Sequence, residues 1–424
     1  MISYKKSIIK LQKSKIKIGN EIINSLDSLN RVSASNIFCG VDNPASNNAA
    51  FDGFAISSKD TKDLNKKNKR LFKILGTTAA GDKPFKKKVK RFQTIEIMTG
   101  GVIPKAFDTI IPIEQIIFYP NKKKPKFILI DKKLDKYQHI RFKGSDYKKK
   151  DLVIKKGTVL QSNHILALKT LGIEKVKVKK ILNILFYSTG NEITDKKNIP
   201  EWKVRNSNNH YIKSLRTNFL FNFEYGGILK DYDEVNFKKK IKKIINSKID
   251  IIITSGAVSA GKFDYIPKII KKFKLSDHFK GVAIRPGKPI LFAKFRSKNK
   301  AIFGLPGNPI SSAACFRFFV YPYLQEILSI EKEHPIKAIL KNKFVKKINF
   351  TRFIKGKLST TSNGKMNITL LPGQESFRIK SFTKSNAWAV LPSGKSRFKK
   401  GEIIDCFLVN QLNKNLLLNC LIML

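Results

Sequence analysis

The stretch Ala301-Ile302-Phe303-Gly304-Leu305-Pro306-Gly307-Asn308-Pro309 runs from a short apolar segment into a turn of two prolines, a glycine and an asparagine. A long, mainly apolar segment follows as far as Leu328. Pro309 suits the first turn of a helix, where the backbone N–H has no intrahelical partner. The stretch therefore predicts a strand over Ala301–Leu305, a tight turn, and a helix over Ile310–Leu328.

The same alternation of strand and helix extends toward the N-terminus as far as Ile181. Ile249–Thr254 is rich in β-branched residues, as strands buried on both faces are. Further strands are expected over Ile181–Tyr187, Gly226–Leu229 and Pro289–Phe295, and helices over Asn208–Asn222, Glu234–Asn246 and Tyr265–Phe273. Alternating strands and helices predict a mainly parallel, doubly wound sheet covered on both faces.

The segments on either side of this α/β unit have different patterns. Apolar residues at mixed three- and four-residue spacing predict an amphipathic helix over Ile18–Val32. A helix is expected over Ser162–Leu171 and a strand over Lys175–Val178. Short apolar runs between turns predict a mostly β segment before residue 140 and a small barrel or sandwich after residue 335. We expect four domains: a linking domain (1–48 and 141–180), a β-rich insertion (49–140), the α/β domain (181–330) and a C-terminal β domain (331–424).

The composition is strongly basic, with 84 Lys and Arg against 31 Asp and Glu and a formal net charge of +53 over 424 residues. One interpretation is binding to a polyanion. The other is a compositional bias spread over the chain, which we favour because the cations are mostly lysine and no aromatic–basic RNA motif or helix-turn-helix is evident. The four cysteines show no C-x-x-C spacing, which argues against a zinc site or disulfide framework. No signal-peptide core and no apolar run of about 20 residues is present, so we expect a cytoplasmic chain without membrane or nucleic-acid partners.

Three strands of the α/β unit end in small, turn-forming residues, and ligands of open α/β sheets bind beyond the carboxyl ends of the strands. Glycine lets backbone amides approach a ligand closely, and amides at a helix start bind phosphate. Each loop alone could be an ordinary turn capped by Ser or Asn. Three loops on one edge favour a cleft for a phosphorylated anion, with candidate residues Ser255, Gly256, Ser259, Pro306, Gly307, Asn308 and Pro309.

A basic loop and a few acidic residues complete the candidates. Arg285-Pro286-Gly287-Lys288-Pro289 fixes two cations three residues apart, which suits an anion, although a surface turn in a lysine-rich chain is the alternative. Carboxylates beside a phosphate site often hold Mg²⁺, and otherwise act as caps or surface charges. The candidates are Asp52, Glu192, Asp231 and Asp264, joined by the hydroxyl of Thr99 in another glycine-containing turn.

Eight segments in register along nearly the whole chain resemble one family. They are Asn48–Ala55, Glu96–Gly100, Arg141–Asp146, Ser188–Glu192, Ser255–Ser259, Arg285–Pro289, Leu305–Pro309 and Pro372–Ser376. Each is weak by itself, but together they resemble the molybdopterin molybdenumtransferase family, MoeA, also found as the E domain of gephyrin.

The resemblance implies a homodimer of elongated four-part subunits with a MogA-like α/β domain. It implies molybdate insertion into adenylylated molybdopterin with Mg²⁺, releasing AMP and giving molybdenum cofactor. Molybdopterin adenylyltransferase and molybdoenzymes would be partners. By position, Asp52 and Thr99 would come from the insertion of the second subunit, and the Pro306–Pro309 loop would support the pterin phosphate. Glu192, Asp231 and Asp264 would hold the metal or the pterin, and Arg285, Lys288, Ser311 and Ser376 would bind molybdate.

The chain also departs from the family pattern. Asn191 and Asn206 stand where Asp is usual, Ala257 replaces a second glycine, and Lys355 stands where an Arg is usual. Arg285 replaces a usual Lys and keeps its charge. Exchange of Asp for Asn removes metal-binding charge, so we expect weaker metal affinity. An active enzyme is the first hypothesis, and a molybdopterin-binding scaffold with weakened catalysis is the second.

Overall fold

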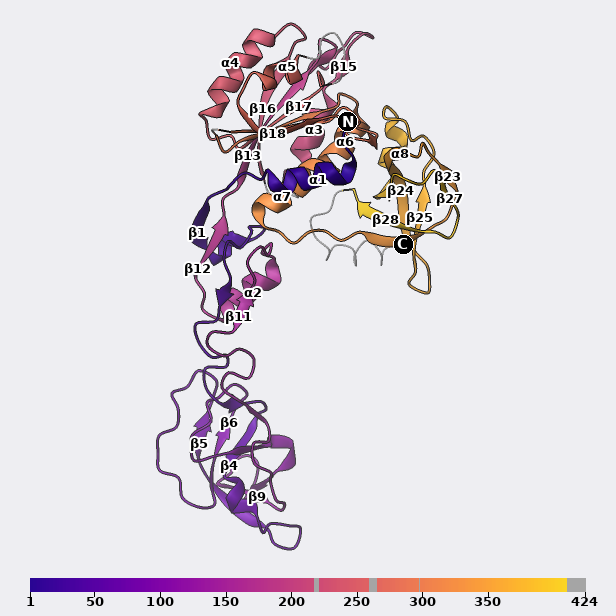
Figure 1. Ribbon diagram of the computed structural model, residues 1–424. Coiled ribbons are helices and arrows are strands. Elements are labelled where there is room, and N and C mark those ends of the chain that lie inside the picture. The colour runs from indigo at the N-terminus through magenta and orange to yellow at the C-terminus, as the bar shows by residue number, and fades with distance from the viewer. Residues whose placement is uncertain (217–220, 259–264, 297, 410–424) are drawn as a thin grey trace.

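The computed structural model describes residues 1–216, 221–258, 265–296 and 298–409. Within these ranges the chain forms three six-stranded sheets and several two-stranded ladders. Figure 1 shows an elongated molecule with one sheet at its lower end, a slender connecting part, and two bulkier parts side by side at the other end. The expected fold class, a multidomain chain with one α/β part and two β-rich parts, is confirmed.

The α/β part is built on a sheet with strand order β16-β13-β17-β21-β20-β18. Four neighbouring strands are parallel: β16 (Phe221–Leu229), β13 (Leu182–Thr189), β17 (Ile251–Ser255) and β21 (Ala301–Leu305). The remaining two, β20 (Leu291–Phe295) and β18 (Leu275–Lys280), form an antiparallel edge. The sheet is mainly parallel, as expected, and its parallel strands end at one common edge.

Helices cover both faces of this sheet. Successive strand residues point to opposite sides, so alternate side chains of one strand belong to two different cores. Ile184 and Phe186 pack in one core with α1 (Tyr4–Lys13), α3 (Ser207–Ser214), α6 (Pro309–Cys315) and α7 (Tyr321–Leu328). Leu185 and Tyr187 pack in the other with α4 (Glu234–Ile245) and α5 (Ile266–Lys271). A π-helical segment, Phe316–Val320, joins α6 to α7, so the helix expected over Ile310–Leu328 is confirmed with a local change of winding.

Two predictions within this part are wrong in their bounds. The helix expected over Asn208–Asn222 ends at Ser214, and the following strand begins at Phe221 rather than at Gly226. The edge strand β18 was not predicted at all. Its exposed positions alternate with half-buried ones and with the buried Phe279 along a charged sequence, which is typical of an edge strand.

The connecting part is a ladder of short antiparallel pairs between distant segments. β1 (Asn20–Asn24) pairs with β12 (Lys175–Lys179), β2 (Ile37–Phe38) with β11 (Leu152–Ile154), and β3 (Asn48–Ala49) with β10 (Ile140–Arg141). The helix expected over Ile18–Val32 is therefore wrong, since β1 and a 3-10 turn at Ser25–Ser28 occupy that stretch. Pairing with a strand far along the chain outweighs the local helical spacing. The helix expected from Ser162 is α2 (Ser162–Thr170).

The sheet at the far end has strand order β7-β4-β6-β5-β9-β8. Its strands are β4 (Gly53–Ile56), β5 (Arg70–Thr78), β6 (Gln93–Ile97), β7 (Thr109–Pro112), β8 (Ile117–Tyr119) and β9 (Phe127–Ile130), with 3-10 turns at Ser58–Thr61 and Ile113–Gln115. All of these residues lie between β3 and β10, which supports the proposal that the segment is an insertion into the linking part.

The C-terminal part is a small barrel. It contains β22 (Ile336–Leu340), β24 (Thr351–Thr360), β25 (Met366–Leu370), β26 (Ala387–Leu391) and β28 (Ile403–Leu408), and it closes because β24 pairs with both β25 and β26. Helix α8 (Ile379–Thr383) and a ladder of β23 (Phe344–Val345) with β27 (Arg397–Phe398) lie beside it. One strand from the α/β part, β19 (Ile284–Arg285), pairs with β24 and joins the two parts.

Among the described helices, none has the length and apolar character that crossing a membrane would require.

Candidate functional site

The loops at the ends of the parallel strands converge on one another. The Thr189 hydroxyl donates to the carbonyl of Ser255 at 2.6 Å, and the Gly256 amide donates to the carbonyl of Leu305 at 2.9 Å. These bonds join the ends of β13, β17 and β21. The structure thus brings Ser255, Gly256 and the Pro306–Pro309 loop together, as their spacing in the sequence suggests.

Asn208 links two of these loops, and sequence reasoning did not single it out. Its side-chain amide donates to Ser255 Oγ at 2.6 Å and to the Gly307 carbonyl at 2.8 Å. The residue is buried at the start of α3, below the strand ends. Its only signal in the sequence is a run of Ser and Asn, which is also what a helix cap looks like.

Two carboxylates lie beside these loops. Asp231 accepts from the Asn191 amide at 3.3 Å, and Asn191 Oδ1 accepts from the Asp231 amide at the same distance. The Glu192 carboxylate lies over Gly190, where an added Cβ would stand 2.3 Å from Glu192 Oε2. Gly190 has a φ of +133°, which also favours glycine.

The Asp231 and Glu192 carboxylates are ligands of the type that Mg²⁺ prefers, since that ion is often held by one or two carboxylates together with substrate phosphates. No group of three His, Cys, Asp or Glu residues that could bind a metal occurs among the described residues. Ser259 and Asp264, the other candidates from this region, lie outside the described residues.

Asn206, one of the departures from the family pattern, has a carboxylate as its neighbour. Its side-chain amide donates to Asp195 Oδ1 at 2.8 Å, and its Oδ1 accepts from the Ser188 hydroxyl at 2.6 Å. The Tyr225 hydroxyl donates to Asp195 Oδ2 at 2.9 Å. Burial, together with Asp195, raises the pKa of Tyr225 to about 12. The loop after β13 thus retains a negative charge beside the neutral Asn206.

A basic cleft of about 570 Å³ lies where the α/β part meets the barrel. Arg285 and Lys288 line it from the basic loop, Ser311 from α6, and Ser376 from a barrel loop. Gly287 allows the basic loop to rest on α6, because its φ is +100° and an added Cβ would stand 2.4 Å from Cys315 Sγ. The structure therefore brings together the four residues that the resemblance suggests for molybdate.

The barrel loop of this cleft is held by Lys355. The residue is 1% exposed, and its ammonium donates to the carbonyls of Gly373, Glu375 and Arg378 at 2.7, 3.3 and 3.0 Å. No carboxylate oxygen lies within ion-pair distance of it among the described residues. Burial lowers the pKa of Lys355 to about 8. Lys355 thus fixes the loop that carries Ser376 and does not itself line the cleft.

Asp52 and Thr99 meet in the insertion. The Thr99 backbone amide and hydroxyl donate to Asp52 Oδ1 at 2.6 and 2.8 Å. These bonds hold the pKa of the Asp52 carboxyl below its usual value. Both residues belong to the sheet region at the lower end of Figure 1, far from the strand ends of the same chain. Within one chain, the structure does not bring them to the other candidates.

Comparison with known proteins covers almost the whole chain. Family models match residues 2–172 as the MoeA N-terminal region (domain I and II), residues 186–326 as a probable molybdopterin binding domain, and residues 337–409 as the MoeA C-terminal region (domain IV). The molybdopterin molybdenumtransferase of Staphylococcus epidermidis is 31% identical over 98% of this chain and 98% of its own. The molybdopterin molybdenumtransferase of Staphylococcus aureus is 34% identical over 90% of this chain and 89% of its own. The chain belongs to the MoeA family.

A solved structure supports the family assignment. The molybdopterin biosynthesis MoeA protein from Pyrococcus horikoshii has a TM-score of 0.81 and 26% identity, and the match covers 96% of this chain and all of the other. Membership of the MoeA family places the chain in molybdenum cofactor biosynthesis, as the resemblance implied.

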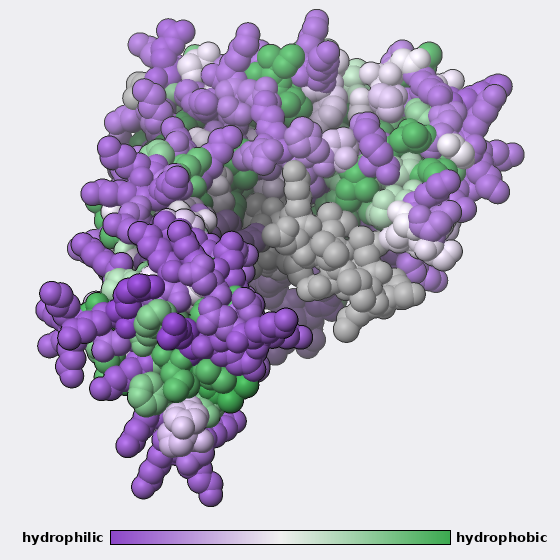
Figure 2. Space-filling view, turned by 90° about the horizontal axis from the view of Figure 1, so that it is seen from below, coloured by the Kyte–Doolittle hydropathy of each residue, from purple (hydrophilic) through white to green (hydrophobic). Residues whose placement is uncertain are grey.

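Hydrophilic surface, and cations in particular, are not confined to the cleft. Figure 2 shows hydrophilic residues over most of the face seen from below, with hydrophobic areas scattered between them. A second hollow, of about 230 Å³, lies at the opposite end of the sheet from the strand ends and is also lined by cations. A basic lining is therefore common in this MoeA chain and does not by itself mark a binding site.

Proposed function

We propose that the chain inserts molybdenum from molybdate into adenylylated molybdopterin, giving molybdenum cofactor and AMP. The observation that carries the proposal is the short path between two sites. Gly307 belongs to the strand-end loops, and Ser311 lines the basic cleft. Only four residues of chain separate Gly307 from Ser311, and four residues span at most about 14 Å even when fully extended. A pterin phosphate at the strand ends and an oxyanion in the cleft would thus be held by neighbouring residues of one loop and helix.

Each group has a task that follows from its chemistry. The Pro306–Pro309 loop offers the backbone amides of Gly307 and Asn308 to the pterin phosphate. Ser255, Gly256 and Asn208 hold this loop against the end of β17. Arg285, Lys288, Ser311 and Ser376 offer charge-assisted hydrogen bonds to molybdate. Glu192 and Asp231, with Asp264, would hold Mg²⁺, which polarises the phosphoanhydride that is broken when AMP leaves.

The assay is AMP release by the full chain with adenylylated molybdopterin, Mg²⁺ and molybdate. We expect Asp231→Ala to lower the rate at least tenfold, because a carboxylate that holds the metal is lost, and to leave molybdate binding within twofold. Glu234→Ala is the matched control, since that carboxylate is exposed and pairs with Lys272 at 3.2 Å. Absence of AMP release beside an active family member would favour the scaffold alternative, in which molybdopterin binds without turnover.

A second copy of the chain would supply Asp52 and Thr99, which supports a homodimer. Their position at the far end of the elongated chain, and the way Thr99 holds Asp52 as a carboxylate, support this assignment. A mixture of Asp52→Ala and Asp231→Ala chains tests it. If the site draws on both subunits, half of randomly formed dimers are mixed and each has one intact site, so about a quarter of the wild-type rate returns. Activity that stays at the level of the separate variants would contradict the shared site.

The same proposal covers location and partners. A biosynthetic enzyme of this family would work in the cytoplasm, receive adenylylated molybdopterin from molybdopterin adenylyltransferase, and pass the cofactor on to molybdoenzymes.

A further inference from the structure

Two arginines stand directly opposite each other where the α/β part meets the barrel. Strands β19 and β24 pair in parallel, and Arg285 and Arg352 are register partners. Two like charges that a strand pair brings close together repel each other. Both residues line the basic cleft, so an anion in the cleft would lie beside both positive charges.

Nothing among the described residues neutralises the Arg352 guanidinium through a hydrogen bond or an ion pair. Its Nε is buried without a hydrogen-bond partner, and its Cζ lies over the Phe344 ring, 5.9 Å from the ring centroid. Burial and the charge of Arg285 lower the pKa of Arg352. A buried donor without a partner costs free energy that a bound acceptor would recover.

The carboxylate nearest to this pair is already engaged. Glu375 also lines the cleft, and its Oε2 forms an ion pair with Arg378 Nε at 3.0 Å. The cleft therefore keeps a surplus of positive charge from Arg285, Arg352 and Lys288, which suits a doubly charged anion.

The neighbouring cation on the same strand cannot fill this role. Lys355 stands where the family pattern usually has Arg, but all of its ammonium donors are directed to carbonyls of the 373–378 loop. It lies three residues from Arg352, and side chains at that spacing point to opposite faces of a strand. In this chain, Arg352 is the β24 guanidinium that reaches the cleft.

We propose that Arg352 binds the oxyanion substrate and forms a clamp with Arg285 in the basic cleft. Planar guanidinium groups present paired N–H donors that match the oxygens of a tetrahedral oxyanion. Bound between them, the anion accepts from the unpartnered Nε side of Arg352 and removes the repulsion across the strand pair. That this anion is molybdate rests on the proposed function; the clamp itself rests on the geometry.

The test is molybdate binding to the full chain by equilibrium dialysis at low salt. We expect Arg352→Met to weaken binding at least tenfold, and Arg352→Lys to give an intermediate loss because charge remains without the fork. Arg397→Met is the control, since Arg397 is an exposed arginine of the same part of the chain, and it should bind as wild type does. In the AMP-release assay, Arg352→Met should raise the KM for molybdate and leave the KM for adenylylated molybdopterin within twofold.

The outcomes separate the two proposals. Binding by Arg352→Met within twofold of wild type would overturn the clamp, whether or not AMP is released. A wild-type chain that releases no AMP, but binds molybdate with the expected dependence on Arg352, would keep the clamp and reject the enzymatic function. Should Arg352→Met fail to fold, Arg352→Lys decides: unchanged binding overturns the clamp, and weaker binding supports it.

Discussion

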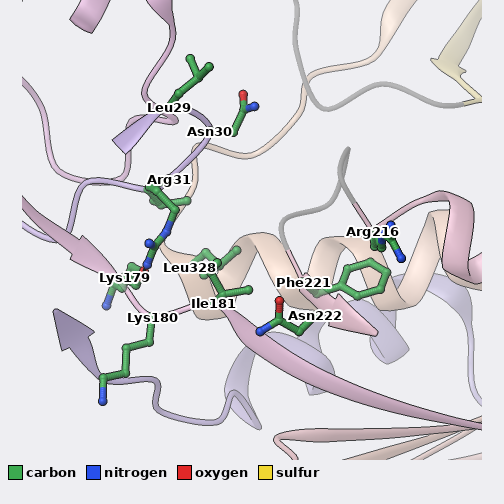
Figure 3. Close-up of a pocket in the computed structure, with 11 residues that line it drawn as sticks. Leu29, Asn30, Arg31, Lys179, Lys180, Ile181, Arg216, Phe221, Asn222 and Leu328 are labelled. Atoms are coloured by element: carbon green, nitrogen blue, oxygen red, sulfur yellow. Dashed lines mark hydrogen bonds between the residues drawn. The ribbon is translucent and has the colours of Figure 1, made fainter. Parts of the chain in front are cut away.

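Two hollows among the described residues are each lined by several cations, and they differ in how their arginines are partnered. In the smaller hollow (Figure 3), Arg31 donates to Glu21 and to the Lys179 carbonyl, and the apolar side chains of Ile181 and Leu328 lie between the charged ends. In the basic cleft, Arg285 and Arg352 are partners in register, and no ion pair with a carboxylate holds either of them among the described residues.

In a chain with a net charge of +53, an anion site is best recognised by how its cations are partnered. Cations are so frequent that their number near a hollow says little. A cation whose charge is already balanced has little to gain from a ligand, whereas cations held together against their repulsion gain much. A pair of arginines in register, neither with an ion-pair partner among the described residues, distinguishes the basic cleft from the smaller hollow, where the half-buried Arg31 is paired with Glu21.

One lysine from each hollow gives the largest expected contrast. Lys288→Ala removes a cleft cation that would meet the oxyanion directly, and charge-assisted hydrogen bonds contribute about 2 kcal/mol, or roughly 30-fold in affinity. Lys180→Ala removes an equally basic side chain from the smaller hollow. We expect molybdate affinity to fall roughly 30-fold in the first variant and to stay within twofold in the second, as measured by equilibrium dialysis.

An equal loss of affinity in both variants would contradict a specific anion site in the basic cleft, because it would mean that net charge attracts the anion wherever the lysine lies. Raising the salt concentration serves as a further control. Screening should weaken binding by both variants, and the ratio between them should persist if Lys288 contacts the anion.

Much of the fold could be predicted from the sequence, because the deciding segments have strong local patterns. The isoleucine-rich strand at Ile251–Ser255 and the strand–turn–helix at Ala301–Leu328 were found from their own residues. The stretch Ile18–Val32 was predicted wrongly, because pairing of β1 with Lys175–Lys179 sets its conformation. The edge strand Leu275–Lys280 escaped notice because its sequence is polar and it depends on β20 for its hydrogen bonds.

Some residues of the candidate site could likewise be predicted from the sequence, and others could not. The glycine- and proline-rich loops and Arg285–Pro289 could be selected because their composition is unusual at strand ends. Asn208 and Arg352 could not, since an Asn at a helix start and an Arg in a barrel strand are ordinary until the fold places them beside Gly307 and Arg285. Family patterns supplied Ser311 and Ser376, whose surroundings in the sequence are not distinctive.

The smallest expected effect concerns the free energy of unfolding rather than anion binding. Lys355, behind the cleft, and Lys179, in the smaller hollow, both have a pKa lowered by burial. The pKa of Lys355 falls from its ordinary value of 10.5 to about 8, with Glu375 and Arg378 as the charged groups near it. Between these values the unfolded chain binds a proton that the folded chain has released, so the free energy of unfolding rises with pH.

The measurement is the free energy of unfolding of wild type minus that of Lys355→Met, by urea denaturation at pH 7 and pH 9. We expect this difference to rise by about 1 kcal/mol over that range, because the folded state stops holding a buried charge. The variant subtracts the titration of every other group that it leaves unchanged. A difference that is flat, or that falls with pH, would show that the three carbonyls of the 373–378 loop stabilise the ammonium enough to offset its burial. In that case Lys355 would resemble the well-partnered Arg31 of the smaller hollow, and the unpartnered charge of the cleft would be confined to its two arginines and Lys288.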